Sequence, residues 1–90
     1  MDRIEALWRR CRAGDPEALE ELVRRWERKL FYYVRRLVAD ESDAWDVLQQ
    51  TWVRVLGGYK RVRDPETLVP WLYRVARSSG EGDTVRTFPR

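Results

Sequence analysis

The chain has 90 residues, 37% of them charged, and a formal net charge of +3, which suits one small domain with a compact core. It contains no His and a single Cys, so the sequence lacks the usual zinc ligand sets, an intramolecular disulfide and any nucleophile with a histidine base. No stretch approaches the roughly 18 apolar residues of a membrane span. We therefore expect a soluble cytoplasmic protein that is not an enzyme, needs no metal or cofactor, and does not associate with a membrane.

Arginine supplies 16 of the 18 basic residues. Its planar guanidinium favours bidentate contacts with phosphate or carboxylate, so a phosphate-rich partner is one interpretation. A GC-rich genome is the other, because the net charge is small. The placement of the charges along the chain has to decide between them.

Two amphipathic helices are predicted in the first 37 residues. Apolar residues recur at three- and four-residue steps from residue 2 to 13, and Gly14 ends this helix. Asp15 and Pro16 then supply an N-cap and a first-turn proline, the start signal of a second helix whose apolar stripe runs to Leu37. This long helix also carries arginines that suit either ion pairs with its own glutamates or contacts with a partner molecule: Arg24, Arg25, Arg28, Arg35 and Arg36.

A third helix is predicted over residues 43–56, capped by Ser42 or Asp43 and ended by two glycines. A basic loop follows over residues 57–65. The last helix is expected to begin at Pro70, because a proline disfavours the helical conformation of the residue before it.

These elements predict an all-α fold, a compact bundle of four helices without strands. Residues 1–79 are assigned to this single domain. Residues 78–84 have the composition of a turn, and residues 80–90 are expected to form an irregular or disordered tail.

Two segments give the chain a recognisable pattern. Residues 43–52, DAWDVLQQTW, are similar to the DAEDLVQETF pattern, and residues 71–77, WLYRVAR, are similar to the WLYRIAR pattern, of bacterial RNA polymerase sigma factors. Two such segments in this order, about twenty residues apart, are specific. The first 77 residues or so resemble region 2 of a sigma factor of the extracytoplasmic-function (ECF) type.

The resemblance implies that the third helix docks on the coiled-coil clamp helices of the polymerase β′ subunit. A carboxylate and two amides on one exposed face can exchange directional hydrogen bonds with such a partner. Trp52 lies on the apolar stripe, so it suits the core as well as the partner. The expected polymerase contacts are Asp46, Gln49, Gln50, Trp52 and Val53.

The resemblance also implies that the loop and last helix capture the non-template strand of the promoter −10 element, with one base turned into a pocket. Cations to follow phosphates and rings to stack on bases are what such a site needs. Trp71 is the ambiguous member, because its neighbours on the helix are apolar and suit a core position. The expected DNA contacts are Tyr59, Lys60, Arg61, Arg63, Trp71, Tyr73, Arg74 and Arg77.

The chain departs from the family beside the expected base pocket: Val62 replaces an aromatic residue, Ser78 replaces an Asn, and Pro70 precedes the Trp. No segment is left for the second helical domain of a complete ECF sigma factor, so the sequence fits either a fragment or a short sigma-like protein. Two functions follow. The first is a sigma region 2 module that recognises and melts the −10 element, and the alternative is a decoy that binds polymerase without productive promoter recognition. An anti-sigma factor is a further candidate partner.

Overall fold

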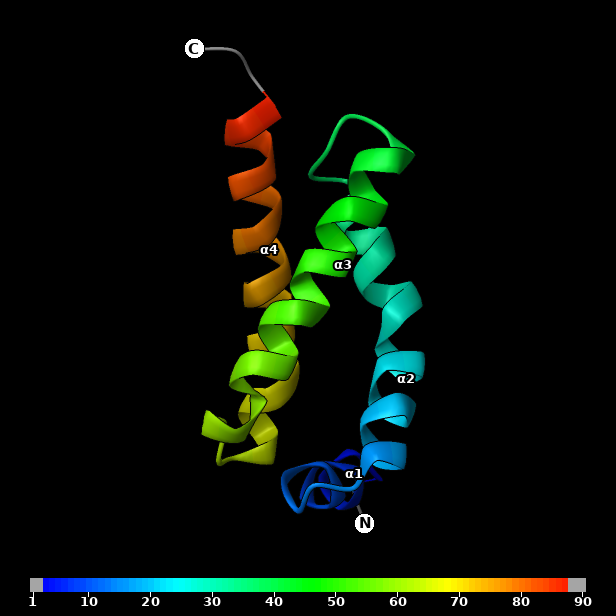
Figure 1. The fold of residues 1–90 in the computed structure, drawn as a ribbon, viewed down its shortest axis with the longest axis vertical. Coiled ribbons are helices and arrows are strands. Elements are labelled where there is room, and N and C mark those ends of the chain that lie inside the picture. The colour runs from blue at the N-terminus through cyan, green and yellow to red at the C-terminus, as the bar shows by residue number, and fades with distance from the viewer. Residues whose placement is uncertain (1–2, 88–90) are drawn as a thin grey trace.

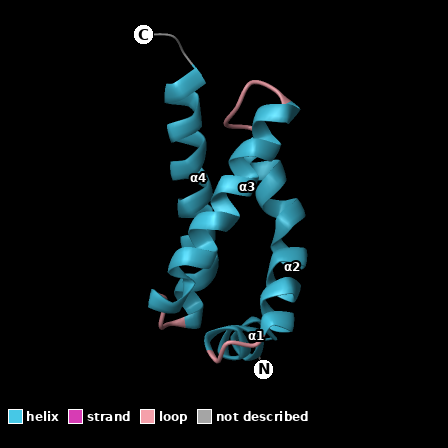
Figure 2. Cartoon of the chain, in the orientation of Figure 1, coloured by secondary structure: helices cyan, strands magenta, loops and turns pink. Residues whose placement is uncertain are grey.

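The computed structural model describes the backbone of residues 3–87 and the side chains of residues 4–81, and it contains four α-helices with short connections (Figures 1 and 2). No strand occurs in this part of the chain, which confirms the predicted all-α fold. Two short 3-10 turns, η1 and η2, join the third helix to the fourth. The elements are α1 Arg3–Arg12, α2 Pro16–Arg35, α3 Glu41–Gly58, η1 Tyr59–Arg61, η2 Pro65–Thr67 and α4 Leu68–Thr87.

The three long helices pack side by side, and α1 lies across the end of the bundle where α2 begins (Figure 1). Each of these helices contacts the other two, and α3 makes the most extensive contacts. Each helix buries one apolar face, as the helical periodicity predicts. The largest fully buried apolar side chains are Trp8, Leu22, Leu30, Leu48, Leu68, Leu72, Val34, Val47 and Val55. Among the described residues, no helix is both long and apolar enough to cross a bilayer.

α1 is tied to the connection between α3 and α4 by its tryptophan. Trp8 is 1% exposed, and its indole Nε1 donates a hydrogen bond of 3.2 Å to the carbonyl of Val62. The ring also meets the edge of Tyr59, with the centroids 5.7 Å apart. The connection is therefore anchored from beneath by an apolar contact and a backbone hydrogen bond.

Small residues allow α4 to approach its neighbours closely. Gly80 is buried, and a Cβ atom added there would lie 3.2 Å from Cδ1 of Leu37 and 3.8 Å from Cγ1 of Val47. Ser79 is also buried and accepts a hydrogen bond from Arg54 on α3 at 3.5 Å. These contacts hold the C-terminal half of α4 against the end of α2 and the middle of α3.

α4 is longer at both ends than the sequence predicted. It begins at Leu68, two residues before Pro70, which the first turn accommodates because the N–H groups there have no intrahelical acceptor. It continues to Thr87, so residues 80–87 are helical where an irregular tail was expected, and residues 88–90 lie outside the described part. The prediction failed because local composition favoured a turn, whereas the packing of residues 79 and 80 favours the helix. The domain boundary at residue 79 stays a prediction.

The cap of α3 also differs from the prediction. Asp40 is the N-cap, with its carboxylate accepting a hydrogen bond of 2.9 Å from the backbone N–H of Asp43. The helix consequently begins at Glu41, and Ser42 and Asp43 lie inside its first turn. Asp40, Ser42 and Asp43 are all residue types that cap helices, and the local sequence alone does not distinguish between them.

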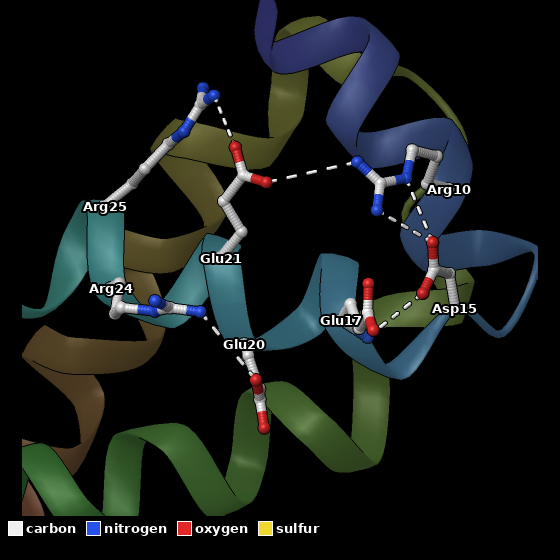
Figure 3. A network of polar contacts seen from close by, with 7 residues as sticks. All are labelled: Arg10, Asp15, Glu17, Glu20, Glu21, Arg24 and Arg25. Carbon is white, nitrogen blue, oxygen red and sulfur yellow. Dashed lines mark hydrogen bonds and ion pairs between the residues drawn. The ribbon is translucent and has the colours of Figure 1, made fainter.

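The corner between α1 and α2 is a polar network (Figure 3). Gly14 adopts φ +93°, and Asp15 caps α2 by accepting a hydrogen bond of 3.0 Å from the N–H of Glu17. Arg10 donates to the same carboxylate at 3.0 Å and reaches Glu21 at 4.0 Å. The hydrogen bond from Arg10 is the main cause that lowers the pKa of the Asp15 carboxyl below its usual range.

We predict that Gly80→Val lowers the free energy of unfolding by about 1–3 kcal/mol, because the added atoms overpack the contact with Leu37 and Val47. Gly57→Val is the matched control, since nothing lies within 4 Å of a Cβ added at Gly57. Its effect should stay within about 0.5 kcal/mol. Urea melts of the two variants would measure the difference, and equal midpoints would contradict the close packing of Gly80.

We predict that Asp15→Asn weakens the dependence of stability on acid pH. Because the folded pKa of Asp15 is depressed, its contribution is fully present above the unfolded pKa near 3.9 and is lost as the pH falls through the folded value. Asn retains capping ability but does not titrate. The wild type should therefore be more stable than the variant at pH 7, and the difference should shrink below about pH 4 in denaturant melts. A difference that is constant with pH would contradict the assignment.

Candidate protein and nucleic-acid interfaces

The outer face of α3 carries three of the expected polymerase contacts. Asp46, Gln49 and Val53 are exposed and recur at three- and four-residue steps, so their side chains project from the same side of the helix. Val53 is 66% exposed and adds apolar area to this side of the helix. Gln50 is half-buried at the margin of this face. The face offers a carboxylate, an amide and an apolar side chain together.

Trp52 lies differently from these residues. It is half-buried and packs against the core cluster, and its indole Nε1 is buried with no hydrogen-bond partner in the described structure. Of the two roles left open by the sequence, the core position fits this geometry better. Its ring helps to hold α3 in place.

Two further apolar side chains border the outer face of α3 on the side of α2. Leu56 is 48% exposed, although its position in the helical periodicity suits the core, and it lines a cleft of about 670 Å3 with Leu19 and Val23. Trp45 is 47% exposed and stacks on Phe31, with the ring centroids 4.3 Å apart. Trp45, Gln49 and Leu56 are four and seven residues apart, so the sequence already places both apolar side chains on the same side of the helix as Gln49. The exposed face is thus wider and more apolar than the sequence suggested.

A basic cleft of about 700 Å3 lies on the other side of α3, where α3, the loop and α4 meet. It brings together the expected residues Arg61, Arg63, Trp71 and Arg74. The indole of Trp71 lies against Gly58, with its Cζ2 atom 3.4 Å from the position of an added Cβ, so the glycine leaves room for the ring. The half-buried indole is therefore part of the cleft wall as well as a contact of the core.

Arg54 is a member of the cleft that the sequence did not single out. It projects from α3 on the side opposite to Trp45, lines the cleft, and donates a hydrogen bond of 3.1 Å to the hydroxyl of Ser78 on α4. Asp64 and Glu66 also line the cleft. Four arginines and two carboxylates leave a net charge of +2, and the cleft is thus cationic with an acidic rim.

Four other expected DNA contacts lie outside this cleft. The expectation that Tyr59 offers an available stacking ring is wrong, because the ring is 7% exposed and packs against Trp8. Lys60 is exposed, and its ammonium lies 6.0 Å from the ring of Tyr59. The remaining two residues are on α4.

Tyr73 and Arg77 lie on the side of α4 that faces α2. The Tyr73 ring is half-buried and meets the edges of Trp26 and Tyr33, with centroid distances of 6.3 and 5.1 Å. We expected Tyr73 on an open DNA face, and the structure turns it toward α2 because two rings there provide an apolar contact. Arg77 is exposed and forms an ion pair of 3.1 Å with Glu81, a surface pair that a phosphate can replace at little cost.

Comparisons with known proteins agree with the sequence pattern. Residues 22–79, more than half of the chain, match the family model described as Sigma-70 region 2. The chain is 27% identical over 85 residues to RNA polymerase sigma-H factor of Pseudomonas aeruginosa, an alignment that covers 94% of this chain and 44% of the relative. No solved structure matches the chain.

Two further relatives are similar over most of the chain. RNA polymerase sigma factor NccH of Alcaligenes xylosoxydans xylosoxydans is 34% identical over 79% of this chain and 38% of its own length. ECF RNA polymerase sigma-E factor of Haemophilus influenzae is 31% identical over 80% of this chain and 38% of its own length. The chain thus spans less than half of the relatives it matches, and it belongs to the Sigma-70 region 2 family, with relatives that include an ECF sigma factor.

Proposed function

We propose that the chain is a sigma factor region 2 module that works in the cytoplasm in transcription initiation. The outer face of α3 docks on the clamp helices of the polymerase β′ subunit, and the basic cleft captures the non-template strand of the promoter −10 element. The observation that carries the proposal is that these two surfaces lie on different sides of the same helix. The names of the relatives, each an RNA polymerase sigma factor, support it.

The docking half of the proposal rests on the chemistry of the α3 face. Asp46 and Gln49 provide acceptors and a donor for a charged coiled coil, and Val53 adds an apolar contact at the centre. Trp45 and Leu56 extend the apolar area toward α2. Burying these exposed apolar side chains against a partner would remove them from water, which would contribute favourably to the free energy of binding.

The DNA half rests on the cleft. Turning a base out of the duplex costs a few kcal/mol, which stacking on an aromatic ring at about 1–3 kcal/mol per base and phosphate contacts can offset. Trp71 offers the ring and Arg54, Arg61 and Arg74 offer the cations. Binding of the opened strand would then trap the melted state without nucleotide hydrolysis.

The decoy function stays a second candidate because of two features of the cleft. Burial of Tyr59 removes one of the expected stacking rings, and Asp64 and Glu66 place carboxylates where a phosphate would pass. A decoy would keep the α3 face and bind polymerase, but it would not hold single-stranded DNA. The two predictions below separate these functions.

We predict that the double substitution Asp46→Ala and Gln49→Ala raises the Kd for a β′ clamp-helix fragment about five- to thirtyfold, corresponding to a loss of about 1–2 kcal/mol. Glu17→Ala, an exposed carboxylate at the far corner of α2, is the control and should leave the Kd unchanged. Calorimetric titration measures the affinities, and a thermal melt checks that both variants fold. Equal affinity of the double variant and the control would remove the docking assignment.

We predict that Arg61→Gln combined with Arg74→Gln weakens binding to single-stranded −10 oligonucleotides and reduces the slope of log K against log salt by about 1.4, because two phosphate contacts are lost. Arg9→Gln with Arg24→Gln is the matched control, since each of these arginines is exposed and paired with a glutamate one turn earlier. Fluorescence anisotropy over a salt series provides both quantities. If the wild type binds the β′ fragment but shows no affinity for the oligonucleotide, the decoy function replaces the promoter-binding one.

A further inference from the structure

The second half of α2 carries a positive charge that the module described above does not use. Residues 28–36, RKLFYYVRR, contain four basic residues and no acidic residue. The first half of the helix is different, because Arg24 pairs with Glu20 at 3.7 Å and Arg25 pairs with Glu21 at 2.6 Å (Figure 3). The helix therefore changes along its length from balanced charge to a net charge of +4 over nine residues.

These cations share one exposed side of the helix. At 100° per residue they fall within about 120°, opposite the buried residues Leu30 and Val34. Tyr32 lies in their midst and is 62% exposed, one of the most exposed large apolar side chains in the described structure. We call this surface the α2 basic face; it consists of Arg28, Lys29, Tyr32, Arg35 and Arg36.

The charges on the α2 basic face are not neutralised by the fold. Within the described residues, Arg28 and Arg36 take part in no ion pair. Arg35 donates to the carbonyls that follow the helix, at 3.3 and 3.4 Å, and a carbonyl leaves its charge intact. Lys29 lies 4.6 Å from the centroid of the Trp26 ring, which also preserves its charge.

A chain of aromatic contacts joins the α2 basic face to the cationic side of α4. Lys29 lies over Trp26, the Trp26 ring meets Tyr73, and Tyr73 precedes Arg77 by one helical turn. Residues 28–36 of α2 contain no carboxylate that would repel a strand passing from Arg77 to Lys29. Glu81, the partner of Arg77, is a carboxylate at the α4 end of this path.

We propose that the α2 basic face binds the phosphodiester backbone of DNA outside the basic cleft. Residues 28–36 span about 12 Å along the helix axis, which matches about three to four phosphates of one strand at 3.4 Å each. Cations alone carry no base information, so the binding is independent of sequence. The proposal rests on the proposed function for the identity of the DNA as promoter DNA, but the surface itself can be tested with any DNA.

The test compares Arg28→Gln combined with Arg36→Gln against the control pair Arg9→Gln with Arg24→Gln, which changes the net charge equally. The probes are a 20-base-pair duplex and a single strand of the same length, both without a −10 sequence. We expect the α2 variant to bind at least about tenfold more weakly at low salt and to lose about 1.8 of the salt slope on the duplex, or about 1.4 on the single strand. The control pair should keep the slope of the wild type.

Tyr32→Ser, in otherwise unchanged protein, identifies which form of DNA is held. If Tyr32→Ser weakens binding to the single strand but not to the duplex, bases stack on the ring. If the arginine variant loses affinity for the duplex but not for the single strand, the face contacts the backbone of duplex DNA. Equal salt slopes for the arginine variant and the control on both probes would overturn the proposal. So would an arginine variant that loses affinity for the β′ clamp-helix fragment and for neither DNA probe. These probes lack the −10 element, so the experiment tests the α2 basic face even if the cleft does not recognise that element.

Discussion

The close packing of α4 against α3 is the constraint on which both proposed surfaces depend. It requires small side chains at the point of contact, and Gly80 and Ser79 supply them where a larger residue would meet Leu37 and Val47. Once α4 is held there, α3 can expose one side to a protein partner and turn another side into the wall of a cleft. A looser contact would separate Arg54 from the hydroxyl of Ser78 and open the cleft between the two helices.

α1 gives the loop between α3 and α4 a support that the three long helices do not provide. Its tryptophan packs against Tyr59 and donates to the carbonyl of Val62, which gives that backbone group a hydrogen-bond partner. The same contact removes Tyr59 from the solvent. The loss of one exposed ring is therefore linked to a fixed loop, and a fixed loop places Arg61 and Arg63 at the cleft before any ligand arrives.

The sequence predicted the features that are determined within a single helix, namely its approximate position in the chain and the residues that share one of its sides. Three- and four-residue periodicity identified four helices and placed Asp46, Gln49 and Val53 together on an exposed side of α3. It could not place Tyr59 and Tyr73, because their rings are covered by α1 and α2, elements that are distant in sequence. Leu56 shows the same limit: its angular position suits the core, but its side chain is 48% exposed and lines an open cleft with Leu19 and Val23 of α2. The extent of α4 was missed because serine and glycine disfavour a helix locally, whereas the tertiary contact of Gly80 needs that helix.

The arrangement of charge explains how the two proposed binding surfaces can share so small a domain. The net charge of +3 does not show where the charges lie on α3: Asp46 lies on the outer face, whereas Arg54, two turns later, lies about 80° around the helix in the cleft. The two positions are about 12 Å apart along the axis, slightly more than the Debye length of about 10 Å at 0.1 M salt. A phosphate in the cleft is thus largely screened from the carboxylate on the docking face. The two proposed binding events can then be tuned independently by substitution, because neither charge contributes much to the other's site.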